Sequence, residues 1–200
     1  AGRGIVHSER APDDRRGKEY VNHGIQLWAA LPRADEEAAP DFEHTPAADI
    51  PSLRVGGATV RVLIGSAFGH RSPVRTFAST VYLDIQLAAG ASFELPPLAG
   101  ELALYAVDGD VQVDGEPVAA HTLALLTPAV TTSILAGSAT RMMVIGGDGL
   151  DGRRFLWWNF VSSRKERIAQ AAQDWERQAL GQVPGDAEFI PLPERRFVLD

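Results

Sequence analysis

The feature that most constrains the fold is a run of short, β-prone segments between Ala58 and Gly146. The segments are rich in Val, Ile, Leu and Tyr, and Gly, Pro or Asp separates them, which is typical of strands joined by tight turns. About seven strands in roughly 90 residues predict an all-β sandwich or barrel of jelly-roll type. The expected strands are Thr59–Ile64, Thr80–Leu87, Leu102–Val107, Val111–Val113, Thr122–Leu126, Ser133–Leu135 and Met142–Ile145.

Two Asp-Gly pairs interrupt this run, Asp108-Gly109 and Asp114-Gly115. Such pairs favour two-residue hairpin turns, because both central positions need a positive φ. We therefore expect a β-hairpin at each pair.

One helix is expected, after the β-region. Ser163 is the candidate N-cap, and Glu166 three residues later would complete a capping box. Gly181 is the expected stop. Apolar residues recur at helical spacing between these points: Ile168, Ala171, Ala172, Trp175 and Ala179. The tail Val183–Pro193 contains three prolines, so we expect it to be extended.

The N-terminal part resembles the edge of another β-domain. One extended segment ends at Glu9, and His23–Pro32 alternates apolar and polar residues like a strand that ends at a proline. Residues 34–57 are acidic and rich in Ala and Pro, which predicts a linker. We therefore expect four parts in chain order: a domain remnant at 1–33, a linker at 34–57, a β-domain at 58–160, and a helix with tail at 161–200.

Composition excludes several classes of protein. The net charge of −7 and the pI near 5.2 argue against nucleic-acid binding through a general basic surface. The chain has no cysteine, which rules out disulfides and thiol nucleophiles within it and is consistent with a cytoplasmic protein. No apolar run approaches the roughly 18 residues needed to span a bilayer, so we expect no membrane partner.

A Gly-x-Gly-x-x-Gly pattern occurs at Gly147–Gly152. A dinucleotide site needs this pattern between a strand and a helix. Here an extended, aromatic segment, Arg153–Phe160, follows it. We therefore interpret the pattern as a turn.

His7 and Glu9 are the candidate metal ligands. If the segment that carries them is extended, both side chains project from the same face, because residues i and i+2 share a face. An imidazole and a carboxylate suit divalent iron with open positions for other ligands. The alternative is a polar strand end with no ligand role. The β-region offers only Glu94, Glu101 and His121 as candidates, and no two histidines there share a register, so we expect that region to be structural.

Three separated motifs carry a resemblance to the pirin family. Ala1–Glu9 resembles the end of the first cupin domain of pirins, and His23–Trp28 resembles the strand that follows it there. Trp158–Ile168, together with Val183–Glu194, resembles the C-terminal signature of bacterial pirins.

The resemblance implies two cupin domains, each a double-stranded β-helix jelly roll, with the first cupin incomplete in this chain. It also implies a metal, usually iron, held by three His and one Glu in the first cupin. His7 and Glu9 match the last two of these ligands. The other two form a His-x-His pair, which does not occur among the five histidines here, His7, His23, His44, His70 and His121. We therefore expect roughly 100 further N-terminal residues, about one small domain, in the intact protein.

Two functions follow from the resemblance. The first is a metal-dependent dioxygenase of the quercetin 2,3-dioxygenase type, with a flavonol as substrate and Fe(II) as cofactor. In that enzyme Glu9 would also act as the base that takes the flavonol proton. The second is a non-enzymatic, iron-dependent module that binds a protein partner, as a transcription co-regulator does. A truncated chain without activity of its own is the third alternative.

Overall fold

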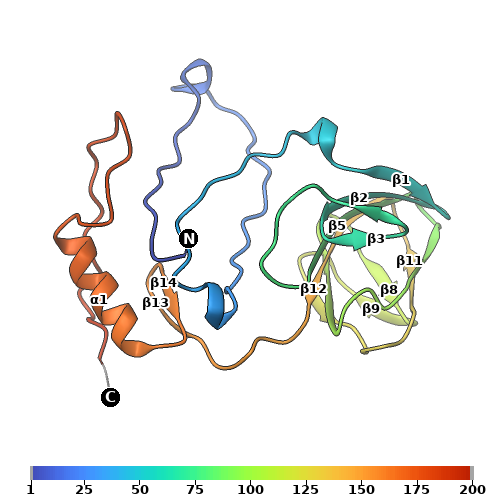
Figure 1. Ribbon diagram of the computed structural model, residues 1–200. Helices are drawn as coiled ribbons and strands as arrows, with labels where there is room; N and C mark the ends of the chain where they lie inside the picture. Colours follow the sequence, from blue (N-terminus) through green and yellow to red (C-terminus); the bar gives the residue numbers. More distant parts are fainter. Residues whose placement is uncertain (1, 199–200) are drawn as a thin grey trace. The chain divides into compact units, whose positions relative to one another are not determined.

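The computed structural model describes residues 2–198, which form two compact units. One unit is continuous, from Glu43 to Gly149. The other is made from both sides of it in the sequence, residues 2–42 and 150–198. Strands dominate the first unit, and the helix α1 (Lys165–Glu176) lies in the second (Figure 1). No helix among residues 2–198 is long and apolar enough to cross a membrane.

The continuous unit is a jelly-roll barrel made of two antiparallel sheets (Figure 1). The larger sheet has the order β1 (Ser52–Val55), β2 (Ala58–Ile64), β5 (Thr80–Leu87), β12 (Thr140–Gly147), β7 (Glu101–Ala106) and β10 (Leu123–Leu125). The smaller sheet has the order β6 (Ser92–Leu95), β11 (Thr132–Ala136), β8 (Val111–Val113) and β9 (Glu116–Val118). A short hairpin, β3 (Ser66–Ala67) and β4 (His70–Arg71), completes the unit.

The barrel core is apolar and is built largely from alternate residues along the strands. On β5, for example, Leu83 and Ile85 are completely buried, and the same pattern recurs on the neighbouring strands. Both sheets contribute to one cluster, which includes Val60, Val62, Phe93, Leu95, Leu104, Ile134, Met142 and Val144. This packing confirms the predicted all-β, cupin-type fold.

All seven predicted strands are present, with ends that shift by one or two residues. The sequence pattern missed β1, β6 and β9. These are strands of three or four residues, too short for their alternation to stand out from the polar and Pro-containing segments around them.

One of the two predicted hairpin turns is confirmed. Asp114 and Gly115 join β8 to β9 with φ values of +52° and +87°, as a tight turn of this type requires. The prediction for Asp108-Gly109 is wrong, because this pair connects β7 in one sheet to β8 in the other. The Asp108 carboxylate instead accepts a hydrogen bond of 2.7 Å from the Arg141 amide.

The second unit contains a hairpin, β13 (Phe155–Trp157) and β14 (Phe160–Ser162), followed by α1. The predicted capping box is wrong: the N-cap is Arg164, and the Ser163 hydroxyl donates to Glu36 at 2.8 Å. The helix ends at Glu176, before Gly181: the Arg177 amide still donates to the Gln173 carbonyl at 3.1 Å, but Gln178 adopts a φ of +54°, which ends the helix. Ile168 and Ala171 are buried, as the helical spacing predicted.

No strand forms over residues 2–42, so the prediction of a strand at His23–Pro32 is wrong for the described chain. The segment is extended, but a strand also needs a hydrogen-bonded neighbour. Its apolar side chains remain accessible, Trp28 with 56% exposure. The short 3₁₀ turns here are η1 (Asp13–Arg15) and η2 (Arg33–Asp35), and η3 (Ala47–Asp49) follows in the barrel unit. After Gly147, the last residue of β12, residues 148–152 form no regular structure apart from bends, and no helix follows them directly, as the interpretation of a turn predicted.

Candidate metal centre

The segment that carries His7 and Glu9 is anchored through the two residues that alternate with them. Arg10 donates to Asp186 from Nε at 2.9 Å and from Nη2 at 2.5 Å, and it pairs with Glu188 at 2.6 Å. Ser8 also hydrogen-bonds the Asp186 carboxylate. In an extended segment the neighbouring residues project to the opposite side. Ser8 and Arg10 therefore contact the tail, whereas His7 and Glu9 have no part in this anchor.

The electrostatics of this anchor are consistent with that arrangement. The amide of Glu188, then the Arg10 guanidinium and the Ser8 hydroxyl, hold the pKa of the Asp186 carboxyl below its ordinary value. Hydrogen bonds to the carboxylates of Asp186 and Glu188 raise the pKa of the Arg10 guanidinium. Asp186 is thus a stable anionic partner, and Glu9 lies outside this network.

His7 and Glu9 are both exposed to solvent. Among residues 2–198, no group of three or more His, Cys, Asp or Glu side chains lies close enough to hold a metal ion. The pair could fill two positions of a metal's coordination sphere, and its imidazole and carboxylate are suitable donors for ferrous iron. Since a preformed set of ligands is needed for high affinity, two donors alone would bind weakly.

The three candidates in the barrel do not converge on its interior. Glu94 on β6, Glu101 on β7 and His121 after β9 are all exposed. His121 adopts a φ of +63° in a turn. The inside of the barrel is filled by the apolar cluster, which leaves these side chains on the outside.

The barrel instead holds a buried charge that sequence analysis missed. Asp84 on β5 is only 1% exposed, on the outer face of the larger sheet. Arg141 binds both of its oxygens, from Nε at 2.8 Å and Nη2 at 2.6 Å, and Arg61 Nη1 lies 3.8 Å away. Burial, and secondarily the Asp84 charge, raises the pKa of Tyr82 next to it. The sequence signal for this buried charge was a single charged residue, Asp84, in a mostly apolar strand.

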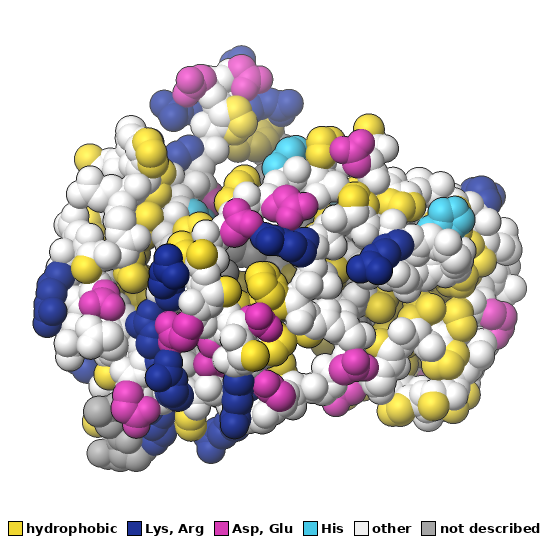
Figure 2. Space-filling model, viewed as in Figure 1, with side chains coloured by type: hydrophobic (Ala, Val, Ile, Leu, Met, Phe, Trp, Pro, Cys, Tyr) yellow, Lys and Arg dark blue, Asp and Glu magenta, His cyan; other side chains and the backbone are white. Residues whose placement is uncertain are grey.

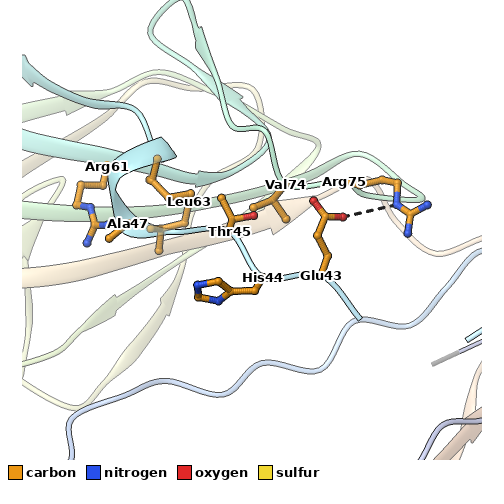
Figure 3. A pocket seen from close by; sticks show the side chains of 9 residues that line it. Glu43, His44, Thr45, Ala47, Arg61, Leu63, Val74 and Arg75 are labelled. Atoms are coloured by element: carbon orange, nitrogen blue, oxygen red, sulfur yellow. Dashed lines mark ion pairs between the residues drawn. The ribbon is translucent and has the colours of Figure 1, made fainter. Parts of the chain in front are cut away.

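An open depression of about 630 Å³ lies at the edge of this cluster, between β2 and the chain that precedes β1. Figure 3 shows its lining, with the Arg61 guanidinium and the His44 ring on the same side and Ala47 between them in this view. At the other end Glu43 pairs with Arg75 at 3.9 Å. Sequence analysis did not identify this depression, because its residues are far apart in the chain and form no motif.

Comparison with known proteins identifies the fold family. The protein-family model described as the Pirin C-terminal cupin domain matches residues 82–181, half of the chain. The chain belongs to the pirin family. A pirin-like protein of Caulobacter vibrioides is 38% identical over 196 residues, which are 97% of this chain and 67% of that protein.

Two further pirin relatives carry the name of an enzyme. A putative quercetin 2,3-dioxygenase of Pseudomonas aeruginosa is 32% identical over 194 residues, 94% of this chain and 56% of that protein. A crystal structure of quercetin 2,3-dioxygenase from Acinetobacter baumannii superposes with a TM-score of 0.76 at 26% identity, covering 84% of this chain and 58% of that one. The chain thus spans between about half and two thirds of the length of the pirins and pirin-like proteins that it matches.

Proposed function

We propose that this chain is part of a metal-dependent dioxygenase of the quercetin 2,3-dioxygenase type, with a flavonol as substrate. The observation that supports the proposal is the anchoring of Ser8 and Arg10 on Asp186, which leaves the neighbouring His7 and Glu9 exposed and outside that network. The relatives named as quercetin dioxygenases support the reaction class.

The proposed protein has two cupin domains. Residues 1–33 would complete the first, metal-binding cupin, residues 34–57 would link it to the second cupin at 58–160, and residues 161–200 would form the helix and tail. The greater length of the relatives supports this division. The remaining metal ligands would then come from outside the 200 residues. We place the protein in the cytoplasm, supported by the absence of cysteine.

The roles of the two residues follow from their chemistry. When bound, ferrous iron would supply the chemistry that lets dioxygen react with the electron-rich flavonol. His7 would hold the metal through a neutral imidazole nitrogen. Glu9 would bind more loosely and accept the proton of the flavonol hydroxyl, since a carboxylate within hydrogen-bond reach of that oxygen can act as general base.

The test is made on the full-length gene product, with Glu9→Gln as the decisive variant. Glutamine keeps an oxygen near the metal but cannot accept the proton, so we expect iron to be retained and oxygen-dependent quercetin loss to fall at least about 100-fold. His7→Ala should lower the iron content as well. Iron with no turnover in the unmodified protein would instead favour the regulatory, protein-binding module. Full turnover in the Glu9→Gln variant would overturn the role of Glu9.

A further inference from the structure

Arg61 carries a guanidinium group that its neighbours do not hydrogen-bond. The Asp84 carboxylate is bound through both oxygens by Arg141, at 2.8 and 2.6 Å, and Arg61 reaches it only at 3.8 Å. A second carboxylate, Asp108, accepts from the Arg141 amide and acts on the Arg141 charge, so the unused donors of this cluster are those of Arg61, which stays protonated. Among residues 2–198, Arg61 has no other polar partner, and its side chain is 31% exposed.

The Arg61 side chain lies at the depression described above, whose lining contains both polar and apolar side chains. His44 and Thr45 add polar groups that have no partner in the part of the chain that the structure describes. Four apolar side chains form the remaining wall: Ala47, Ile50, Leu63 and Val74. At the far end, Glu43 and Arg75 pair with each other, so the guanidinium with unused donors is at the Arg61 end (Figure 3).

We propose that this depression binds a small organic acid that has one carboxylate and a flat apolar body. The carboxylate would accept hydrogen bonds from the Arg61 guanidinium, which matches a carboxylate's two oxygens, and from the His44 ring. The apolar body would lie on Leu63 and Val74. A wall of this composition with a few convergent polar groups is typical of small-molecule sites, and about 630 Å³ is ample for a single-ring acid.

The choice of an organic acid over inorganic phosphate follows from charge and polarity. One guanidinium with unused donors matches the two oxygens of a carboxylate, and the apolar wall offers nothing to the further oxygens of phosphate. The site lies on the outer face of β2, and none of its residues belongs to the His7–Glu9 pair. The proposal therefore extends beyond the proposed dioxygenase and does not depend on it.

The experiment uses 4-fluorobenzoate as the probe and follows its ¹⁹F NMR line width with the full-length protein. The neutral isostere 4-fluorobenzamide is the matched ligand. We expect saturable binding of the acid, with a dissociation constant on the order of 1 mM, because the site is small and open. Arg61→Gln should weaken binding about tenfold through the loss of the charge-assisted hydrogen bonds, and His44→Ala should weaken it a few-fold.

Two control variants locate the effect. Arg54→Gln removes a positive charge from the adjacent strand β1, where Arg54 donates to Thr59 at 2.9 Å outside the depression, and should leave binding unchanged. Glu9→Gln should also leave it unchanged, which separates this site from the proposed metal centre. Because His44 is exposed, loss of binding in His44→Ala cannot come from unfolding. Equal binding of the amide, equal competition by phosphate, or unaltered binding in Arg61→Gln would each overturn the proposal.

Discussion

At the scale of single residues, Asp186 shows how a tail that lacks regular structure is held at a defined place. Its carboxylate accepts hydrogen bonds from the Glu188 amide at 3.0 Å and from Arg10, 176 residues away in the sequence. All of these groups favour the ionised form, and they lower the pKa of Asp186. A group of this kind contributes stability above its ordinary pKa and loses it as the pH falls through the native value.

The pKa of Asp186 should therefore respond to Arg10 in part. In Arg10→Gln we expect the Asp186 pKa to rise toward its ordinary value without reaching it, because the Glu188 amide still donates. Side-chain ¹³C NMR titration of the carboxyl measures this directly. Arg16→Gln is the control, since Arg16 pairs with Asp13 and not with Asp186. An unchanged Asp186 pKa in Arg10→Gln would mean that Arg10 does not anchor the tail.

At the scale of elements, Glu36 replaces the predicted helix cap. It accepts from the Ser163 amide at 2.9 Å and from the hydroxyls of Ser163 and Ser162, and Arg154 Nε lies 2.7 Å from it. The side chains of Glu36 and Arg154 are only 10% and 6% exposed. The end of β14 and the approach to α1 thus depend on a carboxylate from a distant segment rather than on the local capping box. Figure 2 shows acidic and basic side chains interspersed over the region of α1.

Glu36→Ala should loosen this junction. It removes the carboxylate that forms an ion pair with the buried Arg154 guanidinium and leaves the Ser163 amide without its acceptor, which should cost about 2 kcal/mol of local stability. Native-state hydrogen exchange of the β13–β14 amides measures the loss.

The neighbouring acid provides the matched control. Glu37 pairs with Arg164 and Arg167, but its side chain is 48% exposed, so Glu37→Ala should cost less than about 0.5 kcal/mol. Equal effects of the two substitutions would show that burial of Glu36 does not matter.

At the scale of the whole molecule, the two units differ in how much core they have. The barrel buries a continuous apolar cluster from both of its sheets. In the other unit the buried apolar residues are Ile168 and Ala171, together with ring contacts such as Trp158–Trp175 at 5.1 Å and Trp175–Phe189 at 5.5 Å. A segment with little buried apolar area opens more readily than a core strand does.

Limited digestion of this chain with trypsin should reflect the difference. We expect early cleavage between Arg10 and Arg33, where the chain has no strand or α-helix, and then after Arg153. Arginines on the barrel strands, such as Arg61 and Arg141, should be cut at least about tenfold more slowly, because cleavage there requires opening of the sheet. Mass spectrometry of the fragments would identify the sites. Cleavage at Arg61 as fast as at Arg15 would contradict our prediction that the barrel is the more stable of the two units.

Most of the barrel could be predicted from sequence because its strands alternate strongly and are separated by turn residues. The Asp114-Gly115 turn was predictable for the same local reason, whereas Asp108-Gly109 carries the same letters but bridges two sheets. Local pattern does not show which sheet a strand joins.

The partners of charged side chains could not be predicted. Ser163 and Glu166 have the correct spacing for a capping box, but the N-cap is Arg164, and the Ser163 hydroxyl donates to Glu36, 127 residues away. The cluster of Asp84, Arg141 and Arg61 is another long-range feature, since it forms only when β2, β5 and β12 pair. The ligand pair His7 and Glu9 was found from its i, i+2 spacing and the family resemblance. Its role stays a prediction.

The discontinuous unit has a consequence for the order of events during synthesis. Residues 2–42 are made before the barrel, but the groups that fix them, such as Arg154, Ser163 and Asp186, are made more than 100 residues later. At about 5–20 residues per second, this segment waits on the order of 10 s while the barrel emerges and can fold. Throughout that interval it lacks the partners that later hold it.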